Sequence, residues 1–389
     1  MLLFEDDIKQ LIESSVTFPL CDQNDNPIPG VRVVDRLATE STWSSIIKPS
    51  EPIPRVVFYS IKGGVGRSTA LAACALALAE ADQQVLLLDL DLESPGLSTS
   101  LLPEDRQPAF GITDWLVEDL VGNGDSIIED LQAESPLPRR GQILVVPAHG
   151  RRLGEYISKL GRVWMPSVPE NGPRRIWSER LARLLGKLEE LHRPDIVLID
   201  SRAGIDEMAS ACLTDLGASR IYLFAQDSVQ TWSGYRLLFQ HWRQNDVALE
   251  MRERLQLVAA MLPSWDGKFD KAATDLWEQA YNLFLETLYD EQPAEIDQAH
   301  DQDDRGVSLE SRNQADGSSE DCSNFSFDLN DQEAPHHACL IPWNQSFAGI
   351  ASHYRRLDGI PSGLLESVYG ELIKNLLIND LHSKLGPPS

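Results

Sequence analysis

One short stretch near residue 60 limits the folds open to this chain more than any other. Residues 56–61 form a mostly apolar run, residues 62–69 read Lys-Gly-Gly-Val-Gly-Arg-Ser-Thr, and a helical pattern begins at Ser68. A buried strand, a glycine-rich turn and a helix in this order form a phosphate cradle, because glycine N–H groups can turn toward an anion and the helix adds the positive end of its dipole. These three parts together predict a phosphate site at Lys62 to Thr69, with the Ser68 hydroxyl placed to bind Mg²⁺.

From residue 55 onward, short apolar runs alternate with longer stretches of helical periodicity. Each run is nearly all apolar, as a strand that is covered on both faces must be. We therefore predict an α/β fold with a doubly wound, mostly parallel sheet of about seven strands. The predicted strands are Val56 to Ile61, Val85 to Asp89, Ile143 to Val146, Ile196 to Asp200, Ile221 to Phe224, Leu257 to Met261 and Cys339 to Ile341. The main predicted helices are Ser68 to Ala81, Ile176 to Leu191, Val229 to Asn245, Ala272 to Leu288 and Leu364 to Leu385.

Two regions fall outside this pattern and divide the chain. Residues 1–54 are rich in turn formers and are interpreted as an N-terminal extension, while residues 290–337 are interpreted as an acidic, disordered insertion. The α/β domain then comprises residues 55–289 and 338–389. Between Asp290 and Glu333, fourteen carboxylates accompany only two arginines. A solvating loop is the favoured interpretation of this composition, and an acidic docking or DNA-mimicking segment is the alternative.

The overall composition limits the compartment and the partners. The chain carries 34 basic and 60 acidic residues, a formal net charge of −26, so as a whole it should repel nucleic acid and anionic membranes. Its five cysteines are scattered and form no C-x-x-C pair, which favours a reducing, cytoplasmic location. No apolar run approaches the roughly 18 to 20 residues that span a bilayer. We expect no membrane partner, and we interpret the apolar stripe between Ile373 and Leu385 as core-facing.

One stretch has the opposite charge bias. Residues 139–187 contain eleven lysines and arginines and only three glutamates. Such a stretch is a candidate face for a nucleic acid or an acidic partner. The favoured interpretation is a solvated helix face that pairs with the acidic insertion.

Aspartates follow two of the predicted strands. Asp89 and Asp91 alternate at the carboxyl end of the strand that begins at Val85, so both can point into the crevice where ligands bind parallel sheets. The plainer interpretation is a pair of aspartates in a turn that ends a strand. Asp200 ends another apolar run, and Gly204 follows it.

These segments resemble the ParA/MinD-like ATPases, a branch of the P-loop NTPases with a deviant Walker A loop. Lys62 to Thr69 is similar to the K-G-G-x-G-K-[ST] loop of that family, in a variant that has Arg67. Val85 to Asp91 resembles the second strand with switch I, and Ile196 to Gly204 resembles the Walker B strand with switch II. The resemblance covers roughly residues 55–262 and 338–385.

The resemblance implies ATP and Mg²⁺ as cofactors and a homodimer that sandwiches the nucleotide. Lys62 would reach across the dimer interface to the partner's nucleotide, and Asp91 would orient the attacking water. Ser68 and Asp200 would hold Mg²⁺, and Gly204 would approach the γ-phosphate with its backbone N–H. The nucleotide itself would be held by Lys62, Gly63, Gly64, Val65, Gly66, Arg67, Ser68 and Thr69.

Two positions depart from the family pattern. Arg67 stands where the family usually has the lysine that contacts the β- and γ-phosphates, and a planar guanidinium is not equivalent to an ammonium. The resemblance therefore implies ATP binding with Arg67 among the catalytic residues. It does not imply fast hydrolysis, because the usual lysine is replaced. Met261 stands where relatives commonly have an asparagine that reads the base, so a preference for adenine is implied by the family alone.

The favoured hypothesis is a dimerising ATPase with slow hydrolysis that acts through a partner protein. The first alternative is a nucleotide-binding scaffold or signalling module with little or no hydrolysis. Lys62 and Asp91 favour the ATPase, whereas Arg67 favours the scaffold. The further alternative is a DNA-partition ATPase, which the basic stretch 139–187 supports and the net charge opposes.

Overall fold

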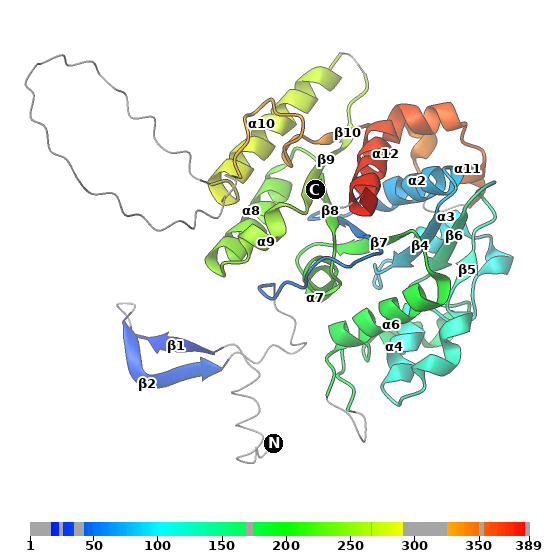
Figure 1. Ribbon diagram of the computed structural model, residues 1–389, viewed down its shortest axis with the longest axis horizontal. Coiled ribbons are helices and arrows are strands. Elements are labelled where there is room, and N and C mark those ends of the chain that lie inside the picture. The colour runs from blue at the N-terminus through cyan, green and yellow to red at the C-terminus, as the bar shows by residue number, and fades with distance from the viewer. Residues whose placement is uncertain are drawn as a thin grey trace, which may run out of the picture.

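The main body of the protein is a single eight-stranded sheet. The structure, a computed structural model, describes residues 17–22, 26–34, 43–168, 174–265, 267–290, 325–349 and 354–385. The strand order is β10-β9-β8-β3-β7-β4-β6-β5 (Figure 1). Every neighbouring pair is parallel except β5 and β6. The strands are β3 (Arg55–Ser60), β4 (Gln84–Asp89), β5 (Ala133–Glu134), β6 (Gln142–Val146), β7 (Ile196–Ala203), β8 (Arg220–Ala225), β9 (Leu255–Leu262) and β10 (Cys339–Pro342).

This sheet confirms the predicted fold class. All seven predicted strands are present, and the prediction missed only β5 among the strands of this sheet in the described part of the chain. A two-residue edge strand is too short to show any periodicity in the sequence. It pairs antiparallel with β6, which leaves the sheet mostly parallel, as expected.

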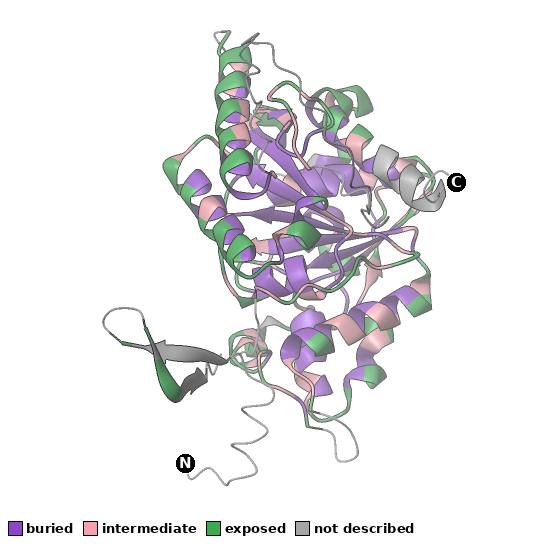
Figure 2. Cartoon of the chain, turned by 60° about the vertical axis from the view of Figure 1, so that its left-hand side comes forward, coloured by how far each residue is buried: buried purple, intermediate pink, exposed green. Residues whose placement is uncertain are grey.

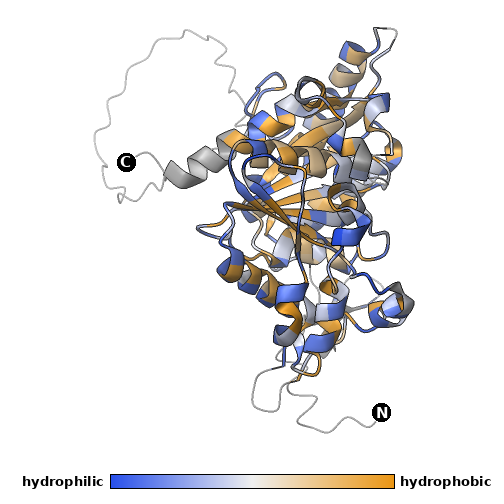
Figure 3. Cartoon of the chain, turned by 90° about the vertical axis from the view of Figure 1, so that its right-hand side faces the viewer, coloured by the Kyte–Doolittle hydropathy of each residue, from blue (hydrophilic) through white to orange (hydrophobic). Residues whose placement is uncertain are grey.

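Helices cover both faces of the sheet because each central strand is apolar on both sides. In β3, Val56 and Phe58 pack on one face while Val57 and Tyr59 pack on the other. The strands are therefore buried between two helical layers, whose outer surfaces are exposed (Figure 2) and more hydrophilic (Figure 3). One layer contains α2 (Arg67–Glu80), α3 (Leu97–Leu101), α11 (Tyr354–Asp358) and α12 (Ser362–Leu385); the other contains α4 (Ile112–Asp119), α6 (Trp177–His192), α8 (Val229–Gln244) and α10 (Phe269–Thr287).

Short helices and turns link the longer elements along the chain. In the described part of the chain, the remaining helices are α5 (Tyr156–Leu160), α7 (Glu207–Ser210) and α9 (Ala248–Arg252). A π-helical turn, η4 (Ala211–Asp215), continues α7. The 3₁₀ turns are η1 (Glu104–Arg106), η2 (Gly124–Asp130), η3 (Leu153–Glu155) and η5 (Gln345–Phe347).

The predicted N-terminal extension contains two different described parts. One is an antiparallel hairpin of β1 (Thr17–Cys21) and β2 (Pro27–Val34). The other, residues 43–54, is attached to the main body by backbone hydrogen bonds from Ile47 to Thr214 (2.8 Å) and from Ser50 to Gly217 (2.9 Å). Packing against the α/β domain therefore begins before residue 55.

The predicted acidic insertion also has a packed part. Residues 291–324, on which the prediction of disorder mainly rests, lie outside the described residues. Asp290 and Phe325 meet, since the Asp290 N–H donates to the Phe325 carbonyl (3.1 Å) and the Phe325 N–H donates to the Asp290 carboxylate (2.8 Å). His336 is fully buried. Residues 325–337 thus differ from the expectation for 290–337, because their aromatic and apolar side chains pack although the segment as a whole is acidic.

The last helix faces the core where its side chains are described. Leu372 and Leu376 of α12 are buried, which confirms the core-facing interpretation of that part of the apolar stripe. Leu381 and Leu385 carry no described side chains. Within the described ranges, no helix combines the length and the hydropathy needed to cross a bilayer.

Candidate functional site

The glycine-rich loop joins the carboxyl end of β3 to the start of α2, as predicted. Gly64 (φ 75°) and Gly66 (φ 81°) have left-handed backbone conformations that favour glycine. An added Cβ at Gly66 would meet the Met261 side chain only at ordinary distance (3.7 Å), so it is the backbone angle that requires glycine there. No side chain caps α2 at Gly66, and the N–H groups of its first turn are suited to meet an anion.

A pocket of about 560 Å³ lies beside this loop. It brings together the loop from Gly63 to Thr69 and Asp91, all of which the sequence predicted. It also contains Arg202, for which the sequence left a place near the phosphates and a place in an exposed loop equally open. Ser60 and Ser94 were not assigned to the site, and their only sequence signal is that they lie beside predicted motifs. The full lining is Ser60, Gly63, Gly64, Val65, Gly66, Arg67, Ser68, Thr69, Asp91, Ser94, Arg202 and Ala203.

Lys62 occupies a different position from the rest of the loop. It is exposed and does not line the pocket, although Gly63 does. Its ammonium group is therefore available at the surface beside the pocket.

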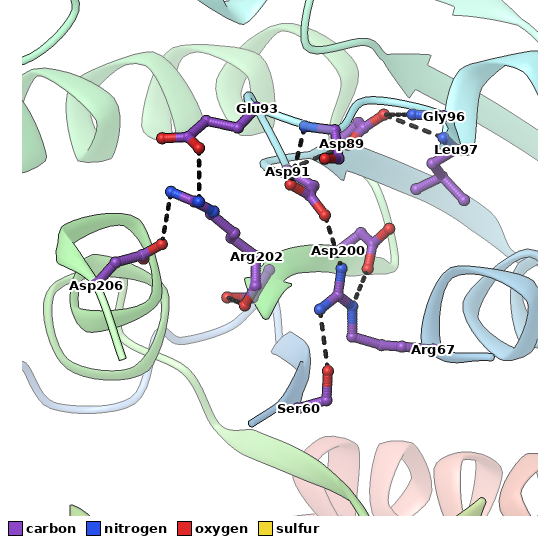
Figure 4. A network of polar contacts seen from close by, with 12 residues as sticks. Ser60, Arg67, Asp89, Asp91, Glu93, Gly96, Leu97, Asp200, Arg202 and Asp206 are labelled. Atoms are coloured by element: carbon purple, nitrogen blue, oxygen red, sulfur yellow. Dashed lines mark hydrogen bonds and ion pairs between the residues drawn. The ribbon is translucent and has the colours of Figure 1, made fainter. Parts of the chain in front are cut away.

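Arg67 is the centre of the polar network at the pocket floor (Figure 4). Its side chain is only 6% exposed, and its Nε donates to the Asp200 carboxylate at 2.6 Å. One terminal nitrogen donates to the Ser60 hydroxyl (3.2 Å) and the other to Asp91 (3.3 Å). Burial by itself would lower the pKa of Arg67, but Asp200 and Asp91 outweigh burial and raise it. Arg67 therefore stays charged and joins the ends of three strands.

Asp89 does not belong to the pocket lining, contrary to the expectation that it points into the crevice with Asp91. It is fully buried, and its carboxylate accepts the backbone N–H groups of Gly96 (3.3 Å) and Leu97 (3.2 Å) at the start of α3. Burial, with Asp200 and Asp91 nearby, raises the pKa of Asp89 to about 8. Asp89 thus positions the segment after β4, and Asp91 alone faces the pocket.

Gly204 is held by β3 and does not line the pocket. Its N–H donates to the Ser60 carbonyl at 2.9 Å, and its own carbonyl accepts the Tyr59 hydroxyl at 3.0 Å. The N–H that the resemblance assigned to the γ-phosphate is therefore already bonded. A nucleotide could reach it only if this contact opened.

Arg202 connects the two segments that follow β4 and β7. It pairs with Glu93 (2.6 Å) and with Asp206 (2.9 Å), and Asp206 also caps α7 by accepting the Ala209 N–H (2.8 Å). Figure 4 shows this bridge beside that of Arg67. Both arginines thus contact the segment after β4, Arg67 through Asp91 and Arg202 through Glu93.

The site provides oxygen donors of the kind that Mg²⁺ prefers. Ser68 lines the pocket, whereas Asp200 is only 1% exposed and lies behind the lining, bonded to Arg67. Mg²⁺ commonly uses one or two carboxylates together with substrate phosphates. Among the described residues, no three His, Cys, Asp or Glu side chains are grouped to hold a metal ion by themselves. The donor set fits a metal that shares its ligands with a phosphate, provided that Arg67 releases the Asp200 oxygen.

The basic stretch 139–187 is partly neutralised inside the domain. Four of its residues pair with carboxylates on or near α4, and none of these carboxylates belongs to the acidic insertion. For these four residues the interpretation as partners of the insertion was wrong, because the fold brings α4 and η2 against α6. The pairs are Lys159 with Asp114 and Glu155, Arg180 with Asp119, Arg183 with Asp119 and Asp125, and Lys187 with Asp125.

Comparisons with known proteins agree with this arrangement. Residues 56–299, more than half of the chain, match the family model described as the CobQ/CobB/MinD/ParA nucleotide binding domain. A comparison with curated proteins found none that matches.

Three solved structures illustrate the range of structural likeness. A ParA family ATPase from Chlorobium tepidum TLS is 14% identical, with 82% of this chain and 98% of that chain covered and a TM-score of 0.48. The septum site-determining protein MinD from Pyrococcus horikoshii OT3, complexed with Mg-ADP, is 19% identical, with 57% and 73% covered and a TM-score of 0.37. Cobyrinic acid a,c-diamide synthase from Mycobacterium smegmatis, with an ATP analog and magnesium, is 20% identical, with 58% and 82% covered and a TM-score of 0.41. Likeness at this level supports no statement about activity.

Proposed function

This chain belongs to the family of CobQ/CobB/MinD/ParA nucleotide-binding domains, and on that premise we propose that it is an ATP- and Mg²⁺-dependent switch of the ParA/MinD type. Two copies would close around the nucleotide, hydrolyse it slowly and act on a partner protein. The protein's residues would position the reactants and stabilise charge, without forming a covalent intermediate.

The exposed position of Lys62 carries this proposal. Lys62 lies beside the pocket without lining it, so it is free to serve the pocket of a second copy. A loop that served only its own nucleotide would have no need for a lysine outside the cradle.

The other residues have roles that their positions support. The backbone from Gly63 to Gly66 and the start of α2 would bind phosphates. Asp91 would orient a water molecule, because its carboxylate faces the pocket. Ser68 and Asp200 would hold Mg²⁺, and the bound ion would neutralise part of the phosphate charge.

Solution mass with and without Mg-ATP, measured together with phosphate release, tests this proposal. We expect ATP to double the mass of the wild type, Lys62→Ala to abolish both the dimer and turnover, and Asp91→Ala to keep the dimer without turnover. Lys271→Ala, which removes an exposed lysine on α10, is the matched control and should behave as the wild type. A mass that does not respond to ATP in the wild type would reject the switch.

The contacts of Arg67 favour a second candidate function, a nucleotide-binding scaffold with little or no hydrolysis. Arg67 is tied to Asp200 and Asp91, the two residues to which metal binding and water orientation are assigned. A scaffold would bind ATP without releasing phosphate. The same experiment separates the two functions, since a scaffold shows binding with no turnover in any variant.

A DNA-partition role is less favoured. Arg180 is fully buried, and Lys159, Arg183 and Lys187 are paired within the domain, so the basic stretch offers less free charge than its sequence suggests. Binding to random-sequence DNA that weakens with salt would support this role. Absence of binding at low salt would reject it.

A further inference from the structure

The contacts of Arg67 suggest more than phosphate binding. Each of its three guanidinium nitrogens donates to the protein: Nε to Asp200 at 2.6 Å, and the terminal nitrogens to Ser60 at 3.2 Å and Asp91 at 3.3 Å. These acceptors belong to β7, to β3 and to the segment after β4, as Figure 4 shows. A single side chain on α2 thus connects three parts of the sheet edge.

A guanidinium suits this connection better than an ammonium, because its donors are spread over three nitrogens while the three donors of a lysine share one. The planar guanidinium presents donors in several fixed directions and keeps its proton at any pH that proteins meet, whereas an ammonium is a compact point charge. Asp200 is 1% exposed, and Asp91 is 17% exposed. These two carboxylates therefore have a permanent cation built into the fold.

That cation competes with a metal for the same carboxylate. Asp200 is the carboxylate that would bind Mg²⁺, and one of its oxygens already accepts from Arg67. A divalent ion at Asp200 would lie beside the positive charge of Arg67. Because Arg67 is buried, little solvent screens the repulsion between the two cations. Metal binding there must either displace Arg67 or tolerate the repulsion.

We infer that Arg67 is an internal counter-ion: it neutralises part of the negative charge of Asp200 and Asp91 that Mg²⁺ would otherwise neutralise. The inference rests on the proposed nucleotide-binding function. The pocket then binds a nucleoside triphosphate with little dependence on Mg²⁺, and the nucleotide-free protein binds divalent metal weakly.

Binding of Mn²⁺ alone to the nucleotide-free full-length protein, measured by electron paramagnetic resonance, tests the metal part. We expect Arg67→Gln and Arg67→Lys to bind Mn²⁺ at least about tenfold more tightly than the wild type, because the bridging guanidinium is gone. Arg139→Gln removes an equal charge from an exposed position outside the pocket and should change Mn²⁺ affinity less than about threefold. Equal Mn²⁺ affinity of the wild type and both Arg67 variants would overturn the inference.

ATP affinity in excess EDTA and in excess Mg²⁺ tests the nucleotide part. The ratio of the two affinities should stay below about threefold for the wild type and exceed about tenfold for Arg67→Lys. Equal ratios in the two proteins would overturn the inference while leaving the nucleotide function intact. Absence of ATP binding in both conditions would instead reject the nucleotide function, and the Mn²⁺ measurement would still decide whether Arg67 excludes metal.

Discussion

Two arginines, Arg67 beside the pocket and Arg180 in α6, are buried, and the charge of each is compensated by different kinds of partner. Arg180 is fully buried. It pairs with Asp119 at 2.7 Å and donates to three backbone carbonyls, those of Leu116, Val163 and Met165. Arg67 instead donates to two carboxylates and a hydroxyl, all of them side chains.

The two arginines also differ in how their surroundings change the pKa of the guanidinium. Burial lowers the pKa of Arg180 despite its bond to Asp119, whereas the surrounding carboxylates raise the pKa of Arg67. Backbone carbonyls cannot leave Arg180 unless the chain unfolds. Of the two carboxylates that Arg67 contacts, Asp91 lines the pocket, where another cation could replace the guanidinium.

The largest expected effect is on the structural arginine. Arg180→Met should lower the free energy of unfolding by about 3–5 kcal/mol, because it leaves Asp119 and three carbonyls without their buried partner. Denaturant titration measures this loss, and ATP affinity of the folded fraction should not change. Arg139→Gln, at an exposed position of the same basic stretch, serves as the control with an effect within about 0.5 kcal/mol. A loss of similar size in Arg139→Gln would show that the buried contacts of Arg180 are not the cause of its effect.

The next effect, a slope of at most about 1.4 kcal/mol per pH unit, should appear in the pH dependence of stability. Burial, with Asp200 and Asp91 nearby, raises the pKa of Asp89 from 3.8 to about 8. The unfolded chain loses this proton near pH 4 while the folded protein keeps it, so Asp89 should lower the free energy of unfolding as pH rises from about 4 to 8. Asp89→Asn should flatten that slope, because an amide does not titrate. The amide oxygen can still accept the N–H groups at the start of α3, so the local structure should be kept.

The control for this measurement lies near Arg180. A hydrogen bond from Lys187 lowers the pKa of Asp125, so Asp125 should stabilise the protein above pH 4 and lose that contribution as pH falls below it. Asp125→Asn should therefore change the acid limb and leave the slope between pH 4 and 8 intact. An unchanged slope in Asp89→Asn would show that Asp89 is not protonated in the folded protein.

The smallest expected effect is at Arg202, a partly exposed arginine of the pocket. Its two ion pairs are accessible to solvent, so Arg202→Gln should lower the free energy of unfolding by less than about 1 kcal/mol. Thermal unfolding at low and high salt measures the change, which salt should diminish in the wild type. A loss as large as that of Arg180→Met would place Arg202 with the structural arginines.

Most of the fold could be predicted because its signals are local. Seven strands are continuous apolar runs, and the glycine-rich loop lies between a strand and a helix whose patterns are clear. The packing of residues 43–54 and 325–337 could not be predicted in this way. Their contacts, such as that of Ile47 with Thr214, depend on partners far away in the chain.

The candidate site was predicted in composition and only partly in arrangement. Asp91 and the loop from Gly63 to Thr69 meet at the pocket, because the carboxyl ends of β4 and β3 lie at the same edge of the parallel sheet, with β7 between them. Asp89 had the same sequence signal as Asp91, yet it supports α3 from the interior. Alternation along a strand says that two side chains share a face, but not which of them the following turn will cover.

The sequence by itself determined an α/β fold of the nucleotide-binding family with a glycine-rich loop between β3 and α2, because apolar strands and left-handed glycines are dictated by neighbouring residues. Only the tertiary structure decided the partners of the charges. Arg67 pairs with Asp200 across 133 positions of the chain, and Arg180 pairs with Asp119 across 61. Charge interactions depend on distance in space and on burial, and both are fixed only when the strands and helices have packed.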